Sequence, residues 1–333
     1  MQTNLRWGIL GTGAIAHKFA HGLRESRTGK LVAVGSRTQE TLSRFLADFP
    51  VRGHPTYDAL LADPEVQAVY ISTPHPLHAE WAIRTAAAGK HILCEKPIAM
   101  NSAETERIVE AARTARVFLM EAFMYRCHPQ TARLLDLIRA GRIGAVRLVQ
   151  AEFSFRTGWN PQSRLLNRAL GGGGILDVGC YCVSMARLIA GAETTEVKAL
   201  AQIGQTGVDE LAVAVLKFPN GMLAQLATGV RLSLGNHVRI WGEEGMIEVP
   251  SPWVINREPG DSLLLVRHEG KPPEEVKIRA DRGIYAIEAD AVAESITAGQ
   301  SPAMTWADSL GNMRTLDRWR EQIGLRYDAD DQK

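Results

Sequence analysis

The sequence lacks the features that define several common protein classes. Its only cysteines, Cys94, Cys127, Cys180 and Cys182, form no Cys-x-x-Cys pair and no zinc-like spacing. We therefore expect four reduced, packed thiols and no bound metal. The net charge is +1, from 38 basic and 37 acidic residues. That balance provides no basic surface for a nucleic-acid partner.

Membrane and export signals are also missing. No apolar run approaches the roughly 18 residues of a membrane span. The N-terminal segment, residues 1–6, has no basic stretch followed by an apolar core and a cleavage site. We expect a cytoplasmic protein without a membrane partner.

The first 125 residues alternate between strand-like and helix-like patterns. Strands are predicted over residues 6–10, 31–35, 68–72, 91–94 and 117–120, and helices over 14–24, 39–49, 56–61, 78–88 and 103–114. The strands are continuous apolar runs, as expected when helices cover both faces of a parallel sheet. Residues 1–125 are therefore predicted to form an α/β domain with a parallel sheet.

The pattern changes after residue 125. Strands are predicted over 146–155, 195–203, 210–218, 221–229, 237–242, 245–249 and 262–268, and helices over 129–140, 175–189, 285–298 and 307–323. Asn220-Gly221 is a strong hairpin signal. We expect residues 126–333 to form an α+β domain on a large, mainly antiparallel sheet, with the C-terminal helices able to pack back on the first domain.

A glycine-rich turn joins the first predicted strand to the first helix. It consists of Gly11, Thr12, Gly13, Ala14 and Ile15, and the small residue Ala16 stands where the motif can have a third glycine. In this GxGxxA pattern the glycines allow a tight turn and let the backbone approach a pyrophosphate at the helix N-terminus. The turn predicts a Rossmann domain that binds a dinucleotide.

The end of the second strand indicates which dinucleotide is bound. An NAD-selective site usually has an acid about 20 residues after the glycine turn. Here Ser36, Arg37 and Thr38 occupy that region. Arg37 can pair with a 2′-phosphate, with the two hydroxyls beside it. The sequence thus favours NADP, with NAD possible.

Polar residues follow the third and fourth strands of the first domain. Thr73, Pro74 and His78 follow the third strand, and Glu95 and Lys96 follow the fourth. The carboxyl ends of parallel strands border the ligand crevice. These residues are therefore predicted to contact the cofactor, and Lys96 is also placed to meet a substrate hydroxyl.

A second candidate group lies after the run of four glycines at 171–174. Asp177 and Tyr181 are four residues apart, so on a helix they share one face. A carboxylate can bind a hydroxyl, and a phenol can transfer a proton. We expect the Lys96 ammonium to lower the tyrosine pKa from about 10 toward neutral pH.

These motifs together resemble the Gfo/Idh/MocA oxidoreductase family. The matching stretches are 11–16, 72–74 with His78, 88–91, 95–97, 172–181, and 308–320. Many members carry histidine where this chain has Tyr181. With tyrosine at this position, the chain resembles the branch that contains glucose-fructose oxidoreductase, NADP-dependent xylose dehydrogenase and dimeric dihydrodiol dehydrogenase.

The resemblance implies roles for the candidate residues. Lys96 and Tyr181 would handle the proton, Asp177 would bind substrate or Lys96, and Arg164 would lie near the cofactor. The outer face of the second sheet would mediate a homodimer or a dimer of dimers. Independently of the family, Arg156, Trp159 and Asn160 lie in a segment before the glycines where a substrate loop is expected.

The sequence therefore predicts an NAD(P)-dependent oxidoreductase acting on CH–OH groups. The expected substrate is a carbohydrate-like small molecule: a sugar, a polyol, or a related diol or keto-sugar. The alternative is a catalytically silent NADP-binding regulator of the same fold.

Overall fold

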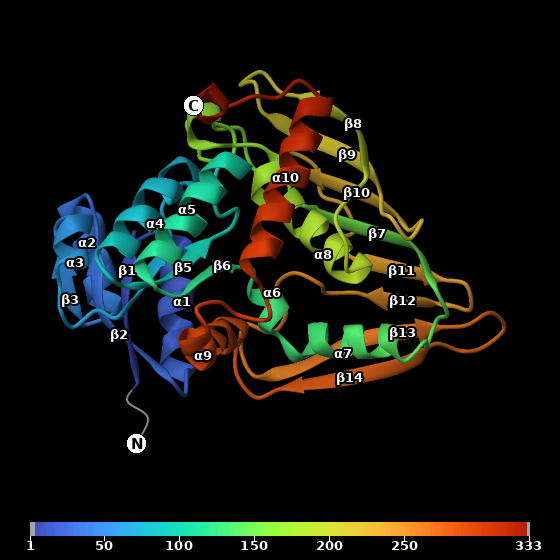
Figure 1. The fold of residues 1–333 in the computed structure, drawn as a ribbon, viewed down its shortest axis with the longest axis horizontal. Helices are drawn as coiled ribbons and strands as arrows, with labels where there is room; N and C mark the ends of the chain where they lie inside the picture. Colours follow the sequence, from blue (N-terminus) through green and yellow to red (C-terminus); the bar gives the residue numbers. More distant parts are fainter. Residues whose placement is uncertain (1–3, 332–333) are drawn as a thin grey trace.

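The chain forms two sheets that lie side by side (Figure 1). The computed structural model describes residues 4–331. The first three residues of the N-terminal segment and the last two of the predicted second domain lie outside the described residues. The predicted division near residue 125 falls between the last strand of the first sheet and the first strand of the second.

The first sheet is parallel, as predicted, with the strand order β3-β2-β1-β4-β5-β6 of a dinucleotide-binding fold. Its strands are β1 (Leu5–Leu10), β2 (Gly29–Gly35), β3 (Arg52–His54), β4 (Ala68–Ile71), β5 (His91–Glu95) and β6 (Leu119–Ala122). Its helices are α1 (Ala14–Glu25), α2 (Gln39–Asp48), α3 (Tyr57–Leu61), α4 (His78–Ala87) and α5 (Ser102–Ala115). The sequence did not reveal β3, because its three residues form no apolar run.

Strand register determines which loops meet at the carboxyl edge of this sheet. Leu10 of β1 lies opposite Ile71 of β4, which in turn lies opposite Cys94 of β5. The glycine turn, the segment after β4 and the turn after β5 therefore emerge next to one another. Sequence positions more than 80 residues apart are brought together in this way.

The second sheet has the order β14-β13-β12-β11-β7-β10-β9-β8 and is antiparallel except for the β7–β10 pair. Its strands are β7 (Val146–Ser154), β8 (Glu196–Ile203), β9 (Asp209–Lys217), β10 (Leu223–Gly229), β11 (Val238–Gly242), β12 (Met246–Val249), β13 (Gly260–Arg267) and β14 (Glu274–Ala280). The Asn220-Gly221 turn joins β9 to β10, as predicted. The edge strand β14 was missed, because its charged, mostly exposed residues look like a solvated turn.

Helices cover one face of this sheet (Figure 1). They are α7 (Pro129–Arg139), α8 (Cys180–Ala190) and α10 (Trp306–Gln322), preceded by the short α6 (Met124–Cys127). The four cysteines are free, and three are buried.

The C-terminal helices also pack on the first half of the chain. Helix α9 (Ile284–Ser295) contacts α1, and α10 contacts α5. Asp290 of α9 is buried and accepts hydrogen bonds from the hydroxyls of Ser26 and Thr28, each at 2.6 Å. These contacts join the C-terminal helices to helices of the parallel sheet.

The predicted helix over 175–189 consists of two parts. Ile175–Gly179 forms a π-helical turn, and α8 follows from Cys180. Asp209 accepts the backbone N–H of Ile175 at 2.7 Å. Gly173 allows this approach, because it has φ of +111° and a Cβ there would lie 2.2 Å from the Asp209 carboxylate. The glycine run thus lets a buried acid cap the helix.

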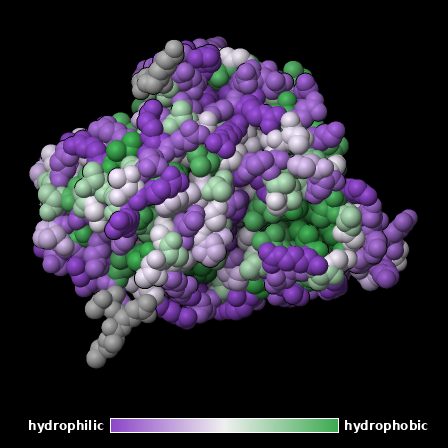
Figure 2. Space-filling view, viewed as in Figure 1, coloured by the Kyte–Doolittle hydropathy of each residue, from purple (hydrophilic) through white to green (hydrophobic). Residues whose placement is uncertain are grey.

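One described segment has the length and composition of a membrane span, contrary to the expectation from the sequence. It is Arg168–Ala190, and 83% of its apolar window is buried within the protein. The segment includes α8, which packs on β7, β10 and α10. Its apolar character is therefore explained by core packing. Figure 2 shows hydrophobic surface gathered around α8, β11 and β12, surrounded by polar residues.

Candidate active site

A cleft of about 590 Å³ opens at the carboxyl edge of the parallel sheet. Both halves of the chain contribute to it. Its lining residues are Gly11, Thr12, Gly13, Ala14, Ile15, Lys18, Ser36, Arg37, Thr38, Thr41, Tyr57, Ser72, Thr73, Pro74, His75, His78, Glu95, Lys96, Met124, Arg164, Asp177, Tyr181, Val254, Arg257 and Tyr285. The cleft therefore contains every predicted catalytic and cofactor-contacting residue.

The glycine turn has the form that a pyrophosphate requires. Gly11 has φ of +102°, and a Cβ there would lie 2.9 Å from the Ser72 hydroxyl. A Cβ on Gly13 would meet nothing within 4 Å, so the space beside it is open. No side chain caps α1, which leaves the N–H groups of its first turn available to an anion. The buried Thr73 hydroxyl also lacks a partner among residues 4–331, which fits a bound polar ligand.

One end of the cleft carries hydroxyls and an arginine. The Ser36 hydroxyl lies 3.3 Å from that of Thr12 and 2.7 Å from that of Thr41. Arg37 has no carboxylate partner within the described part of the chain. Tyr57 lies beside Arg37, and burial raises the pKa of its phenol. This end has no acid among its lining residues to repel a 2′-phosphate.

A cluster of charges lies at the centre of the cleft. The Lys96 Nζ donates to the backbone oxygen of Asp177 at 2.7 Å and lies 3.3 Å from its carboxylate Oδ1. The Arg164 Nη1 donates to the same Oδ1 at 2.9 Å. The Asp177 side chain is 4% exposed, whereas that of Arg164 is 52% exposed. Asp177 therefore anchors two cations that come from different halves of the protein.

These contacts determine the charge states in the cluster. Burial acts to raise the pKa of Asp177, but Lys96 and Arg164 outweigh it and hold that pKa well below its usual range. Burial acts to lower the pKa of Lys96, but the Asp177 carboxylate outweighs it and the pKa is raised. At neutral pH the cluster is an ionised carboxylate between two cations.

Tyr181 lies beneath the ammonium group of this cluster. The Lys96 Nζ is 5.2 Å from the centre of the Tyr181 ring, and the phenol donates to the Met124 Sδ at 3.4 Å. Phe123 and Phe153 pack against the ring edge-on, at centroid distances of 5.0 and 5.1 Å. Tyr181 is thus held in an aromatic cage with one open side toward the cleft.

The predicted lowering of the tyrosine pKa is wrong for this structure. Burial, followed by the nearby Glu95 carboxyl, raises the pKa of Tyr181 well above its ordinary value. Lys96 does not compensate, because its ammonium faces the ring and is already bound to Asp177. Tyr181 is therefore a neutral phenol that can donate a proton.

Glu95 and His78 are held by partners at the ends of the strands that border the cleft. Glu95 accepts a short hydrogen bond from the buried Tyr70 phenol. His78 is fully buried, with its ring nitrogens 2.8 Å from the carbonyl oxygens of Pro97 and Thr73. Burial lowers its pKa to about 4, and a neutral ring donates to only one carbonyl at a time. His78 therefore joins the two strand-end turns.

Three predicted substrate residues lie outside the cleft. Arg156 forms an isolated bridge with Arg231, and the Arg231 guanidinium stacks over the Trp159 ring at 5.7 Å. Asn160 accepts the backbone N–H of Gln162. The structure does not bring these side chains to the cleft, because their segment packs against the connection between β10 and β11.

Several lining residues were not predicted from the sequence. They are Lys18, Thr41, Tyr57, Ser72, Met124, Val254, Arg257 and Tyr285. Lys18 is three residues after Ile15, so the helical repeat could have indicated it. Val254, Arg257 and Tyr285 come from distant connections, and no local pattern links them to the glycine turn.

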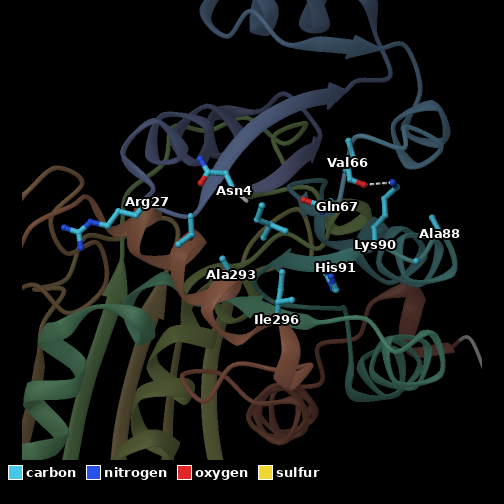
Figure 3. Close-up of a pocket in the computed structure, with 12 residues that line it drawn as sticks. Asn4, Arg27, Val66, Gln67, Ala88, Lys90, His91, Ala293 and Ile296 are labelled. Carbon is cyan, nitrogen blue, oxygen red and sulfur yellow. Dashed lines mark hydrogen bonds between the residues drawn. The ribbon is translucent and has the colours of Figure 1, made fainter. Parts of the chain in front are cut away.

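A second cavity of about 390 Å³ lies at the opposite, amino-terminal edge of the parallel sheet (Figure 3). Its Lys90 ammonium donates to the backbone oxygens of Asp63 and Val66, at 2.8 and 2.7 Å. His91 accepts the backbone N–H of Phe118. These groups already have partners, and no catalytic cluster lies there. Within residues 4–331, no group of histidine, cysteine or acidic side chains is arranged to hold a metal ion.

The fold and the cleft define a dinucleotide-dependent oxidoreductase. The profile described as "Oxidoreductase family, NAD-binding Rossmann fold" matches residues 5–123, and the "GFO/IDH/MocA C-terminal domain" matches residues 131–248. The chain belongs to the Gfo/Idh/MocA family of NAD(P)-dependent oxidoreductases. The predicted family, enzyme class and cofactor type are therefore confirmed.

Named relatives span almost the whole chain. Mouse trans-1,2-dihydrobenzene-1,2-diol dehydrogenase is 33% identical over 98% of this chain and 99% of its own length. D-xylose 1-dehydrogenase (NADP(+)) 2 of Haloferax volcanii is 32% identical over 94% of this chain and 95% of its own. A 3-ketoreductase from Actinomadura kijaniata, solved with NADP, has a TM-score of 0.87 and 28% identity, covering 96% of this chain and 98% of the other.

Proposed function

We propose that this enzyme transfers a hydride between NADP and a sugar, a polyol, or a related diol or keto-sugar. The carrying observation is that Lys96 hydrogen-bonds Asp177 and lies over the Tyr181 ring, in the cleft that the glycine turn also lines. The relatives named for a diol, a sugar and a ketoreduction support this class of substrate. Retention of the whole cluster argues against a catalytically silent regulator.

The cofactor residues fall into two groups. The turn from Gly11 to Ile15 would hold the pyrophosphate, while Ser36, Arg37 and Thr38 would hold the 2′-phosphate. Thr73, Pro74, His78, Glu95 and Arg164 would complete the wall around the nicotinamide half. When bound, NADP supplies or accepts the hydride, and the protein supplies orientation and proton transfer.

Lys96 and Tyr181 have separate roles in the proposed reaction. Lys96, held by Asp177, donates a hydrogen bond to the substrate oxygen and stabilises negative charge on it. The Tyr181 phenol, released from Met124, donates its proton to that oxygen as hydride reaches the carbon. For alcohol oxidation the same groups act in reverse, and Tyr181 must first lose its proton. The neutral phenol is the form of Tyr181 that donates a proton in carbonyl reduction.

A substrate panel tests this function. Aldoses, ketoses and cyclic diols are assayed with NADP and NAD in both directions by the absorbance of the nicotinamide. We expect turnover with at least one class and a preference for NADP. Tight NADP binding without turnover of any class would instead identify the silent regulator.

We also propose that the protein is a homodimer, or a dimer of dimers, in the cytoplasm. Large apolar side chains are exposed on the sheet face opposite α8 and α10. They are Leu200, Val213, Val215, Leu223 and Trp241, from strands β8, β9, β10 and β11, with β7 between the last two. An apolar face of this kind requires cover, which a second copy provides.

A further inference from the structure

Two cations line the cleft without a counter-ion. Lys18 comes from the second turn of α1, and Arg257 comes from the connection between β12 and β13. Within residues 4–331, neither side chain forms an ion pair or a side-chain hydrogen bond. Both residues come from segments that the catalytic cluster does not use.

The two cations repel each other. Burial lowers the pKa of Lys18, and the charge of Arg257 lowers it further, while Glu95 only partly offsets them. Glu95 is itself occupied by the Tyr70 phenol. The other carboxylate that lines the cleft, Asp177, is already shared by Lys96 and Arg164. An anion between Lys18 and Arg257 would relieve this repulsion.

The two cations enter the cleft from segments other than the one that carries the 2′-phosphate residues. Along α1, Lys18 lies between the glycine turn and Gly22, whose Cα packs against Tyr285. The Arg257 carbonyl lies against Gly283, immediately before α9. Tyr285, Val254 and Met124 also line the cleft, and Ser36 lies next to Thr12. Lys18 and Arg257 thus reach the cleft from segments that carry neither the 2′-phosphate residues nor the catalytic cluster.

We propose that Lys18 and Arg257 form a substrate subsite for an anionic group. The substrate would then carry a phosphate or a carboxylate at a distance from the reacting carbon. Both groups accept charge-assisted hydrogen bonds from an ammonium and a guanidinium. This inference rests on the proposed function, because Lys96 and Tyr181 orient the reacting end of the same molecule.

The test compares a neutral sugar with its charged counterparts. The probes are D-glucose, D-glucose 6-phosphate and D-glucuronate, each assayed for kcat/KM with saturating cofactor. A charged sugar should be preferred at least about 10-fold, and the better of the two identifies phosphate or carboxylate. Lys18→Met and Arg257→Met should each reduce that preference about 10-fold, while Lys18→Arg should largely retain it. The matched control is Lys30→Met, at an exposed position of β2.

A binding measurement separates this subsite from the proposed function. Calorimetry measures inorganic phosphate binding to the NADP-loaded protein and to its Lys18→Met variant. Binding that the variant loses supports the subsite even if no sugar is turned over, in which case only the proposed function fails. The subsite is overturned if neutral and charged sugars react equally and phosphate does not bind. It is also overturned if Lys18→Met weakens NADP binding alone, because the pair would then serve the cofactor pyrophosphate.

Discussion

At the scale of single residues, we propose that Arg37 selects NADP over NAD. Its guanidinium lines the end of the cleft where no acid is present, beside the hydroxyls of Ser36 and Thr38. A 2′-phosphate would give it a charge-assisted partner that NAD lacks. This difference can be measured without any knowledge of the substrate.

Arg37→Ala should therefore weaken NADP binding by roughly 10- to 100-fold and change NAD binding little. Fluorescence titration with each reduced cofactor measures both constants. Arg44→Ala, which removes an exposed arginine of α2, is the control and should change neither. Equal losses for NADP and NAD in Arg37→Ala would exclude a role in binding the 2′-phosphate.

The identity of the site residues was more predictable than their charge states. Strand ends placed Lys96 at the crevice, helical spacing put Asp177 and Tyr181 on one face, and the family resemblance joined the two groups. The tyrosine pKa was not predictable, because it depends on burial and on the side of the ring that Lys96 occupies. Lys18 and Arg257 were missed because their proximity depends on the packing of two distant segments.

At the scale of elements, the π-helical turn before α8 positions the Asp177 carboxylate. The buried Asp209 of β9 caps this turn through the backbone N–H of Ile175. Burial raises the pKa of Asp209 from 3.8 to about 7. Sequence periodicity predicted the helix, but it could not reveal the π turn or the cap, because both depend on contact with a strand about 35 residues later.

The raised pKa makes stability depend on pH in a definite direction. Between roughly pH 4 and 7 the folded protein keeps a proton on Asp209 that the unfolded chain has lost. The contribution of this residue to the free energy of unfolding therefore falls as pH rises through that window. A rise of about three in this pKa lowers the free energy of unfolding by at most ~4 kcal/mol. The full loss is reached above pH 7.

Asp209→Asn removes this titration while retaining an oxygen that can accept the Ile175 N–H. The free energy of unfolding of the variant minus that of the wild type should therefore be larger at pH 8 than at pH 5. Denaturant unfolding at both pH values measures the difference, with the substitution of the exposed Asp136 of α7, Asp136→Asn, as the control. An Asp209→Asn effect that is the same at both pH values would contradict a buried, protonated carboxyl.

At the scale of the whole molecule, the exposed face of the second sheet predicts association. Leu200 is 77% exposed and lies opposite Val213 on the neighbouring strand. Wild-type protein at micromolar concentration should have at least the mass of a dimer by light scattering. The double substitution Leu200→Asp and Val213→Asp would place like charges across a two-fold interface and should yield monomers. Leu232→Asp, at an exposed apolar site outside the strands, is the control, and a monomeric wild type would refute the interface.

The overall architecture was largely predictable, because strand and helix periodicities identify the two kinds of sheet. Among the strands, the sequence did not reveal the edge strands β3 and β14, one of which is short and the other highly charged. The way the two halves form one cleft was not predictable in detail. The proposed cluster forms only when the two halves come together. Lys96 follows β5 of the first sheet, while Asp177 and Tyr181 belong to elements that cover the second sheet.

The most direct test of this account is the turnover of Tyr181→Phe on the enzyme's best substrate. The substitution removes only the phenolic oxygen, whose partner in the structure is the Met124 sulfur, so the aromatic cage should be preserved. We predict that kcat falls by about 10²- to 10⁴-fold, the usual contribution of general acid–base catalysis, while NADP affinity stays unchanged. Near-normal turnover by Tyr181→Phe would show that the proton comes from another group and would contradict the proposed mechanism.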